Sequence, residues 1–434
     1  MSRRALGAAT LVASASPALG RIPYGGVLRL AIPWSVTRLD PHALDDPIAA
    51  LFARACCDCL YELDALGRAF PALAAAWPER SGGSIRVRLR PHLVTAAGRP
   101  LLGADVRASL LRSLEKGALL PGDAPRVDAM DPLLLHFAGA SPEALTQRLA
   151  TPLLAIVPRG FSPANPDATG AFSAHLERGL LVLTRNLNAA RGPAFLERIE
   201  VRTVVDLADA LRAFERGSAD VGWLGNGLHQ PRSDGVAFRG IEYGWVVLRT
   251  GQSVRGWGAP GVAQQLLDGI DPRRLQHLGL EGLAIPGAAD AGGWRGGPSV
   301  LRVADDAPQL VMIARSVAAA LERPGHPIGV ELIGNAELQQ RRTSGDFALM
   351  LDFVRSLGPP GPLTQLALLS AQDPELAKKP PRVASFEPRS LARSLSLGVL
   401  GQLWAGGAHA SAFQGLAGWQ LGNVWRTPDD GALR

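Results

Sequence analysis

Short apolar runs separated by turns make up most of the chain. Residues 27–32 form an aliphatic run that a proline ends, which predicts a strand. Ile85, Val87 and Leu89 alternate with arginines, a period of two that is typical of a strand with one solvent-exposed face. Residues 104–115 instead bring apolar side chains to one side at helical spacing, so they predict an amphipathic helix.

Strand and helix patterns alternate along the rest of the chain. The further predicted strands are residues 133–137, 153–157, 180–184, 199–205, 219–224, 300–303, 328–333 and 347–353. The further predicted helices are residues 47–60, 206–216, 262–267, 308–321 and 336–343, with another that starts at Ser141. Residues 251–300 are rich in glycine and carry little other pattern. This alternation predicts an α/β fold with helices layered on a sheet.

Length and composition exclude several classes of protein. A chain of 434 residues is long enough for two or three domains, at about 150 residues each. Hydrophobic residues make up 47% and charged residues 19%, which predicts a sizeable core and excludes global disorder. The net charge is +6, but the basic residues are mostly arginines spread along the chain. Because no basic cluster forms, we expect no binding to nucleic acid.

Residues 1–20 have the layout of a secretory signal peptide. Two arginines precede the apolar residues 5–15, and small residues follow at plausible cleavage positions. We therefore expect export to the periplasm, with the mature chain starting between Ser16 and Ile22. The paired arginines leave a twin-arginine route open beside general secretion, and an uncleaved cytosolic N-terminus is the alternative.

Motifs for catalysis, metals and cofactors are missing from the sequence. Cys56, Cys57 and Cys59 have no second cluster of metal-binding residues, so we interpret them as small core residues rather than as a metal or redox site. The eight histidines are scattered, and no nucleophile elbow or phosphate-binding loop is present. We expect a protein that is not an enzyme and that holds no metal and no cofactor.

Several short motifs occur together in one order along the chain. They are Gly26-Val27-Leu28-Arg29-Leu30-Ala31, Leu39-Asp40-Pro41-His42, Leu60-Tyr61-Glu62-Leu63, Pro71-Ala72-Leu73-Ala74, Val87-Arg88-Leu89-Arg90, Gly98-Arg99-Pro100-Leu101, Thr169-Gly170-Ala171-Phe172, Leu183-Thr184-Arg185-Asn186, Gly217-Ser218-Ala219-Asp220 and Gly345-Asp346-Phe347-Ala348-Leu349. Each motif is weak alone. In this order they resemble the peptide/nickel class of periplasmic solute-binding proteins that serve ABC transporters.

The resemblance implies a two-lobed α/β periplasmic-binding-protein fold of the class II type, with a hinge and an extra N-terminal subdomain. On this basis we expect a first lobe, an inserted subdomain and a second lobe that is smaller than usual. Their predicted ranges are residues 21–47, 166–250 and 390–434 for the first lobe, 48–165 for the subdomain and 251–389 for the second lobe.

The resemblance also implies a function. A monomer would capture a peptide-like or other small solute in the cleft between the lobes and deliver it to an ABC permease in the inner membrane. The alternative is a sensor or interaction protein that has kept the fold but no longer supports transport.

Aromatic residues at the ends of predicted strands are candidates for the ligand cleft, because clefts form where strands pass into loops. Trp34 follows the first strand, and Trp245 begins the strand that would lead to the hinge. Trp223 ends another strand, and Asn226 stands in the glycine-rich turn after it. A separate group of tryptophans is expected to pack the C-terminal segment onto the first lobe. These are Trp404, Trp419 and Trp425.

Asp352 is the remaining candidate, because it is a carboxylate inside an otherwise apolar run. The resemblance implies an acidic residue near this place that holds the amino group of a peptide. A buried carboxylate needs a partner. That partner is predicted to be either a ligand ammonium group or Arg355, which is also assigned to the site.

Overall fold

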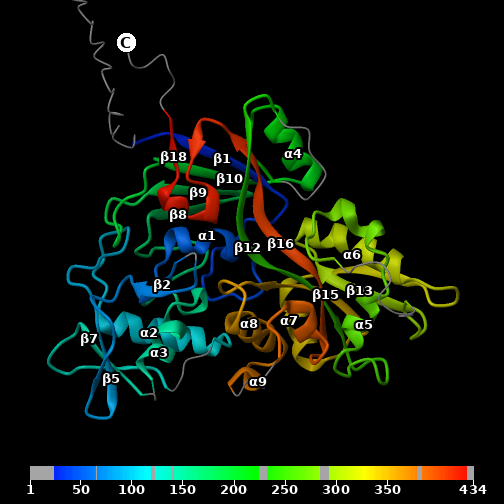
Figure 1. The fold of residues 1–434 in the computed structure, drawn as a ribbon, viewed down its shortest axis with the longest axis horizontal. Helices are drawn as coiled ribbons and strands as arrows, with labels where there is room; N and C mark the ends of the chain where they lie inside the picture. Colours follow the sequence, from blue (N-terminus) through cyan, green and yellow to red (C-terminus); the bar gives the residue numbers. More distant parts are fainter. Residues whose placement is uncertain are drawn as a thin grey trace, which may run out of the picture.

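A curled ten-stranded sheet with helices packed against it forms the centre of the fold (Figure 1). The computed structural model describes residues 24–64, 66–118, 123–138, 141–223, 232–283, 293–378 and 384–427, and all structural statements refer to these residues. The sheet has the order β14-β13-β15-β12-β16-β11-β1-β10-β9-β8. The predicted signal peptide, residues 1–20, lies outside the described residues.

The first lobe is built on one half of this sheet. Its strands are β1 (Val27–Ile32), β8 (Phe172–Glu177), β9 (Leu180–Arg185), β10 (Arg198–Thr203) and β11 (Val221–Trp223). β1 is parallel to β10 and β11, whereas β8, β9 and β10 are antiparallel neighbours. Helices α1 (Pro47–Cys56) and α4 (Leu207–Glu215) pack against these strands.

The second lobe is built on the other half of the sheet. Its strands are β13 (Ser299–Ala304), β14 (Ile328–Ile333) and β15 (Leu349–Arg355). Its helices are α5 (Val262–Asp268), α6 (Pro308–Leu321), α7 (Asn335–Ser344), α8 (Pro362–Gln372), α9 (Pro374–Lys378) and α10 (Pro388–Ala392). α6 and α7 cover the parallel strands β13 and β14, the layering that the sequence pattern predicts.

Two long antiparallel strands join the lobes and form the hinge. β12 (Gly235–Thr250) and β16 (Leu397–Ala410) run from the first lobe into the second (Figure 1). Their pairing shifts register at three places, two of which flank Glu242. Gly244 stands at one of them, and a Cβ there would lie 2.4 Å from the Phe353 ring, so only glycine fits.

A smaller four-stranded sheet forms a separate subdomain below the first lobe in Figure 1. Its strands are β4 (Glu79–Ser81), β5 (Ser84–Arg88), β6 (Arg126–Val127) and β7 (Leu134–Phe137), accompanied by α2 (Gly103–Glu115) and α3 (Pro142–Leu149). The hydroxyl of Ser141 accepts a hydrogen bond from the Ala144 backbone and caps α3, as predicted. The remaining strands are short pairs, β2 (Tyr61–Leu63) with β3 (Ala69–Pro71) and β17 (Phe413–Gln414) with β18 (Trp425–Arg426).

The two-lobed α/β fold with an extra subdomain is confirmed, with local corrections. Residues 153–157 are not a strand, since a 3₁₀ turn (Pro152–Leu154) and irregular backbone occupy this stretch. α1 ends at Cys56 rather than near residue 60, because Cys57 adopts an extended backbone. The domain boundaries stay a prediction.

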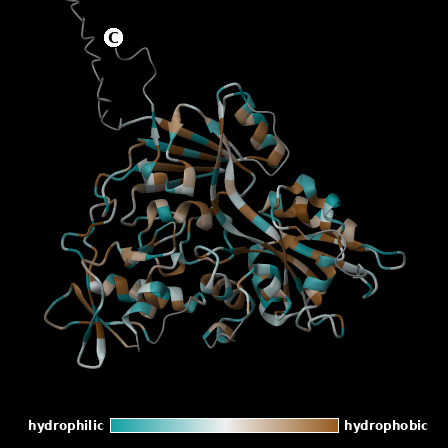
Figure 2. Ribbon diagram, in the orientation of Figure 1, coloured by the Kyte–Doolittle hydropathy of each residue, from teal (hydrophilic) through white to brown (hydrophobic). Residues whose placement is uncertain are grey.

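Buried aliphatic residues concentrate on the strands and the inner helix faces, as the brown colouring in Figure 2 shows. One core cluster centres on the parallel strands of both lobes, and a second lies between the subdomain and the helices α8 and α10. Among the residues described, no helix combines the length and apolar character needed to cross a membrane.

Candidate functional site

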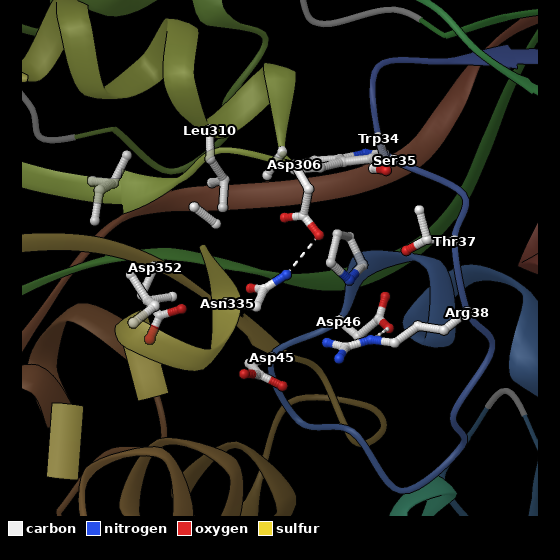
Figure 3. Close-up of a pocket in the computed structure, with 15 residues that line it drawn as sticks. Trp34, Ser35, Thr37, Arg38, Asp45, Asp46, Asp306, Leu310, Asn335 and Asp352 are labelled. Atoms are coloured by element: carbon white, nitrogen blue, oxygen red, sulfur yellow. Dashed lines mark hydrogen bonds and ion pairs between the residues drawn. The ribbon is translucent and has the colours of Figure 1, made fainter. Parts of the chain in front are cut away.

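A small polar cavity of about 40 Å³ lies between the lobes (Figure 3). One side is the loop that follows β1, and the other is formed by the end of β13, the middle of β15 and the starts of α6 and α7. The residues that line it are Trp34, Ser35, Thr37, Arg38, Asp45, Asp46, Pro47, Ala304, Asp306, Ala307, Leu310, Asn335, Leu338, Leu351 and Asp352. This volume holds little more than a water molecule or two.

Ion pairs close the polar cavity. The carboxylate of Asp352, only 2% exposed, accepts Nε of Arg249 at 2.9 Å and lies 2.8 Å from Nη2 of Arg342. Arg342 also donates to Asp45 at 3.2 Å, and this guanidinium holds the pKa of Asp45 below its usual range. Because Asp45 belongs to the first-lobe loop and Arg342 to α7, this network ties the two lobes together.

Arg355 is not the partner of Asp352, which corrects that prediction. The two residues are three positions apart on β15, so their side chains leave opposite faces of the strand. Arg355 is buried and donates from Nη1 to the Pro41 carbonyl at 2.8 Å, while its backbone N–H donates to the Leu44 carbonyl at 2.7 Å. Burial lowers its pKa to about 10. A ligand role for Asp352 or Arg355 stays a prediction.

The predicted tryptophans occupy different environments. Trp34 lines the polar cavity and is 1% exposed, and its indole nitrogen has no hydrogen-bond partner among the described residues (Figure 3). Trp245 lies inside β12 rather than at its beginning and is buried in the core. The backbone of Trp223 pairs with Gly407 at the end of β11. Asn226 and the side chain of Trp223 lie outside the described residues.

A second cavity, of about 310 Å³ and largely apolar, lies where β12 and β16 cross between the lobes. The hinge strands, α1, β2 and the segment after β15 surround it. Its lining residues are Ala50, Arg54, Leu63, Asp64, Ala150, Pro152, Gly240, Ile241, Glu242, Tyr243, Arg355, Ser356, Leu357, Gly358, Pro359, Pro360, Trp404, Gly418 and Gln420. We call it the hinge cavity.

Glu242 is the one carboxylate of the hinge strands that lines this cavity. It stands opposite Trp404 in the register between β12 and β16, so both side chains leave the same face of the sheet. Burial raises the pKa of Glu242 to about 7, and the nearby Glu281 adds to this shift. Trp245 and Ser356 lie beside the carboxyl group, but the Trp245 indole nitrogen makes no well-formed hydrogen bond.

No arginine or lysine among the described residues forms an ion pair with Glu242. The two arginines that line the same cavity are engaged elsewhere. Arg54 lies 3.5 Å from Glu62, and Arg355 donates to the Pro41 carbonyl. Glu242 is therefore a carboxylate in a largely apolar cavity without a cation of its own.

Trp404 does not pack the C-terminal segment onto the first lobe, which corrects that prediction. It belongs to the hinge strand β16, lines the hinge cavity, and carries the Arg239 guanidinium 4.0 Å above its ring. Trp419 does pack as predicted, since its indole N–H donates to the Leu51 carbonyl in α1 at 2.8 Å. Trp425 lies in β18, which pairs only with β17 in the described sheets.

Sequence reasoning missed the hinge cavity, although a signal was present. Glu242 interrupts the apolar part of β12 and stands between Gly240 and Gly244. Glycines that flank a charged residue within a strand indicate bulges, which redirect side chains and are common beside functional sites. This pattern could have directed attention to Glu242.

A third cavity, of about 370 Å³, adjoins the hinge cavity and shares Ala50, Arg54, Leu63 and Ile241 with it. Its polar wall is an ion-pair cluster in which Arg191 lies 3.1 Å from both Asp58 and Glu62. Because these acidic and basic groups are paired with one another, the wall is polar but offers no unpaired charge to a ligand.

The three cysteines are buried and unbridged, and they fill core space as predicted. Burial raises the pKa of Cys59 to about 12, so its thiol is protonated and unreactive near neutral pH. Within the part of the chain that the structure describes, no three His, Cys, Asp or Glu residues gather as a metal site would require.

Comparisons with known proteins support the fold. No protein-family profile and no curated protein sequence matches the chain. Its structure is similar to DppA from Helicobacter pylori, an ABC transporter-associated periplasmic binding protein in complex with the peptide STSA, with TM-score 0.71, 15% identity and coverage of 94% of this chain and 99% of that one.

Two further solved structures are similar over nearly the whole chain. The oligopeptide-binding protein AppA from Bacillus subtilis, in complex with a nonapeptide, has TM-score 0.71, 13% identity and coverage of 94% and 100%. NikA from Staphylococcus aureus, in complex with Ni(L-His)2, has TM-score 0.67, 14% identity and coverage of 92% and 100%. At these identities the similarity shows a shared two-lobed fold, as the sequence motifs predict.

Proposed function

We propose that the chain is a solute-binding protein of an ABC importer, which captures a peptide-like or other small solute between its lobes and delivers it to a permease. The observation that carries this proposal is the match, over more than nine-tenths of the chain, to binding proteins with the same two lobes. Fold similarity alone does not define function. The hinge cavity adds a local reason, because it offers a ligand-sized space at the junction of the lobes.

The arrangement of two lobes joined by a hinge suits a protein that captures a ligand by closing the lobes around it. In the part of the chain that the structure describes, two long strands, β12 and β16, cross between the lobes, and their pairing is irregular around Glu242 and Gly244. A ligand that contacts both lobes binds the closed arrangement more tightly than the open one, and this difference in affinity stabilises the closed arrangement. We assign the protein no catalytic step, since the similar proteins are named as binding proteins rather than enzymes.

We further propose that the protein works as an exported monomer, with residues 1–20 as a cleaved signal peptide. Mass spectrometry of protein isolated from its native cell tests this. The expected mature N-terminus lies between Ser16 and Ile22, and an intact N-terminus in the mature protein would remove the export proposal.

The binding function is tested by thermal-shift screening against a library of di- and tripeptides, amines, sugars and metal chelates. A ligand that binds only the folded state raises the melting temperature as its concentration increases. Substitution Ala50→Phe fills the hinge cavity from α1 and should abolish the shift, because Ala50 lines it. Ala104→Phe is the matched control, since it makes the same change at an exposed position of α2. If no solute shifts the wild-type protein, the proposed function is wrong.

A further inference from the structure

We propose that the hinge cavity binds a small primary amine with apolar substituents, the class to which an apolar dipeptide belongs, and that Glu242 is the anionic partner of its ammonium group. The inference rests on the proposed function and deepens it, because it names the class of solute and the residue that selects it. It concerns a carboxylate on the hinge strand, distinct from the Asp352 network between the lobes.

The cavity fits the apolar part of such a ligand. Its volume of about 310 Å³ lies at the lower end of the range usual for small-molecule sites, about 300–1,000 Å³. Leu63, Leu357 and paired prolines at 359–360 contribute apolar surface. Burying an aliphatic side chain against these residues is favourable by the hydrophobic effect.

The charge of the ligand follows from what Glu242 lacks. A carboxylate moved out of water is stable only when a cation or hydrogen-bond donors replace its hydration. Trp245 and Ser356 lie beside the carboxyl group, but neither side chain carries a charge. The arginines that line the cavity already have acceptors, and no described ion pair involves Glu242. A ligand ammonium group would supply the missing charge.

An aromatic residue favours the same class of ligand. Trp404 lies opposite Glu242 on the paired hinge strand and lines the cavity, with the Arg239 guanidinium over its ring. The faces of Trp rings attract cations, and the contact with Arg239 shows that this ring accepts one. An anionic ligand would instead meet a carboxylate that has no compensating cation.

The polar cavity does not compete for this role, because its volume of about 40 Å³ is too small for such a ligand and its carboxylates already have partners. Asp306 there accepts a hydrogen bond from the Asn335 side chain. Asp352 there already holds Arg249 and Arg342, so a ligand ammonium would have to displace a formed ion pair. Asp45 likewise is held by Arg342. Glu242 is therefore the better partner for an incoming cation.

The test is calorimetric titration at pH 8 with leucyl-leucine and 2-phenylethylamine, each compared with its N-acetyl derivative. Acetylation removes the positive charge and keeps the apolar body. We expect both free amines to bind wild type, and the acetylated forms to bind at least about 30-fold more weakly, as expected for loss of a desolvated charge partner. Glu242→Gln should lose the same factor toward the free amines.

Asp64→Asn is the matched control. Asp64 lines the same cavity, but it is already paired with Arg68 at 2.7 Å, so its loss should leave affinity within about twofold. Circular dichroism and melting temperatures establish that each variant is folded. Equal binding of amines and acetyl derivatives, or unchanged affinity in Glu242→Gln, overturns the inference.

Failure of the inference is distinguishable from failure of the proposed function. If wild type binds neither amine but a neutral or anionic solute shifts its melting temperature, the inference is wrong and the function stands. If no solute in the library binds, both are wrong.

Discussion

Two of the cavities at the junction of the lobes differ in how one carboxylate in each is paired. In the polar cavity, Asp352 holds two guanidinium groups at 2.8–2.9 Å, and one of these arginines also holds Asp45. In the hinge cavity, Glu242 lies in a largely apolar lining, beside Trp245 and Ser356, and has no described ion pair. Asp352 is fully buried and Glu242 is half-buried, so both carboxylates have lost much of their hydration. A buried carboxylate that is already paired, such as Asp352, stabilises the fold, whereas one without a cation, such as Glu242, is a candidate to bind a ligand.

The largest expected effect comes from breaking the polar network. Asp352→Ala leaves Arg249 and Arg342 buried without their carboxylate, which should lower the free energy of unfolding by about 3–5 kcal/mol. Urea denaturation measures the change. Asp346→Ala is the control, because Asp346 is 77% exposed and lies 3.7 Å from Arg341, where an ion pair contributes about 0–1 kcal/mol. An Asp352→Ala protein of normal stability that had lost ligand affinity would instead support the ligand role predicted from the sequence.

A smaller effect, on binding rather than folding, is expected at Trp404. Trp404→Leu removes an aromatic face from the hinge cavity while keeping an apolar side chain there. Affinity for leucyl-leucine should fall about tenfold, the range for a cation–aromatic contact at a partly desolvated site. Calorimetry measures this loss. Trp77→Leu, at an exposed tryptophan outside the cavity, is the control and should bind like wild type. Equal losses in the two variants would contradict a local role for Trp404.

Ligand binding at the hinge cavity should depend on pH. Glu242 has a pKa of about 7, above its ordinary value of 4.5, so only the ionised form at higher pH attracts an ammonium group. Affinity for 2-phenylethylamine should therefore fall about tenfold between about pH 8 and pH 6. In Glu242→Gln this dependence should disappear. The other charged residues that line the cavity are Arg54, Asp64 and Arg355. Glu281 lies near enough to raise the pKa, and Arg239, over the Trp404 ring, is paired with Glu281 at 2.9 Å.

The raised pKa of Glu242 also predicts how the stability of the ligand-free protein changes with pH. A carboxyl group with a raised folded-state pKa contributes stability that is fully present below its unfolded pKa and is lost as the pH rises through the folded value, here about 7. Wild type should thus lose stability relative to Glu242→Gln between about pH 5 and pH 8. Solvent at the cavity mouth screens part of this, so we expect about 1–2 kcal/mol. Parallel unfolding curves for the two proteins would contradict the raised pKa.

The smallest expected effect is at the cysteines, which lie in the core. Cys56, Cys57 and Cys59 are buried, and burial raises the pKa of each thiol. Iodoacetamide at pH 8 should leave the native protein unmodified and label all three cysteines after unfolding. Mass spectrometry counts the labels. A single label on the folded protein would show that this part of the core opens.

The local pattern of the sequence determined the secondary structure of both lobes. Residues 308–321 and 328–333 were predicted from periodicity and coincide with α6 and β14. This succeeds because periodicity reports which face of an element is buried, and that information is local. The failure at residues 153–157 has a local cause too. An apolar run beside Pro152 is consistent with a strand but folds as a 3₁₀ turn and irregular backbone.

The ion-pair partners of the buried charged residues depended on the tertiary structure and could not be read from the sequence. The sequence indicated that Asp352 needs a partner, but Arg249 lies on another strand and Arg342 on a helix, so only strand order and lobe packing select them over Arg355. It likewise could not place Glu242 opposite Trp404, because that register depends on bulges between two strands far apart in the chain. The pattern of buried positions can be inferred from consecutive residues. The pairing of charges depends instead on which distant segments the fold brings together.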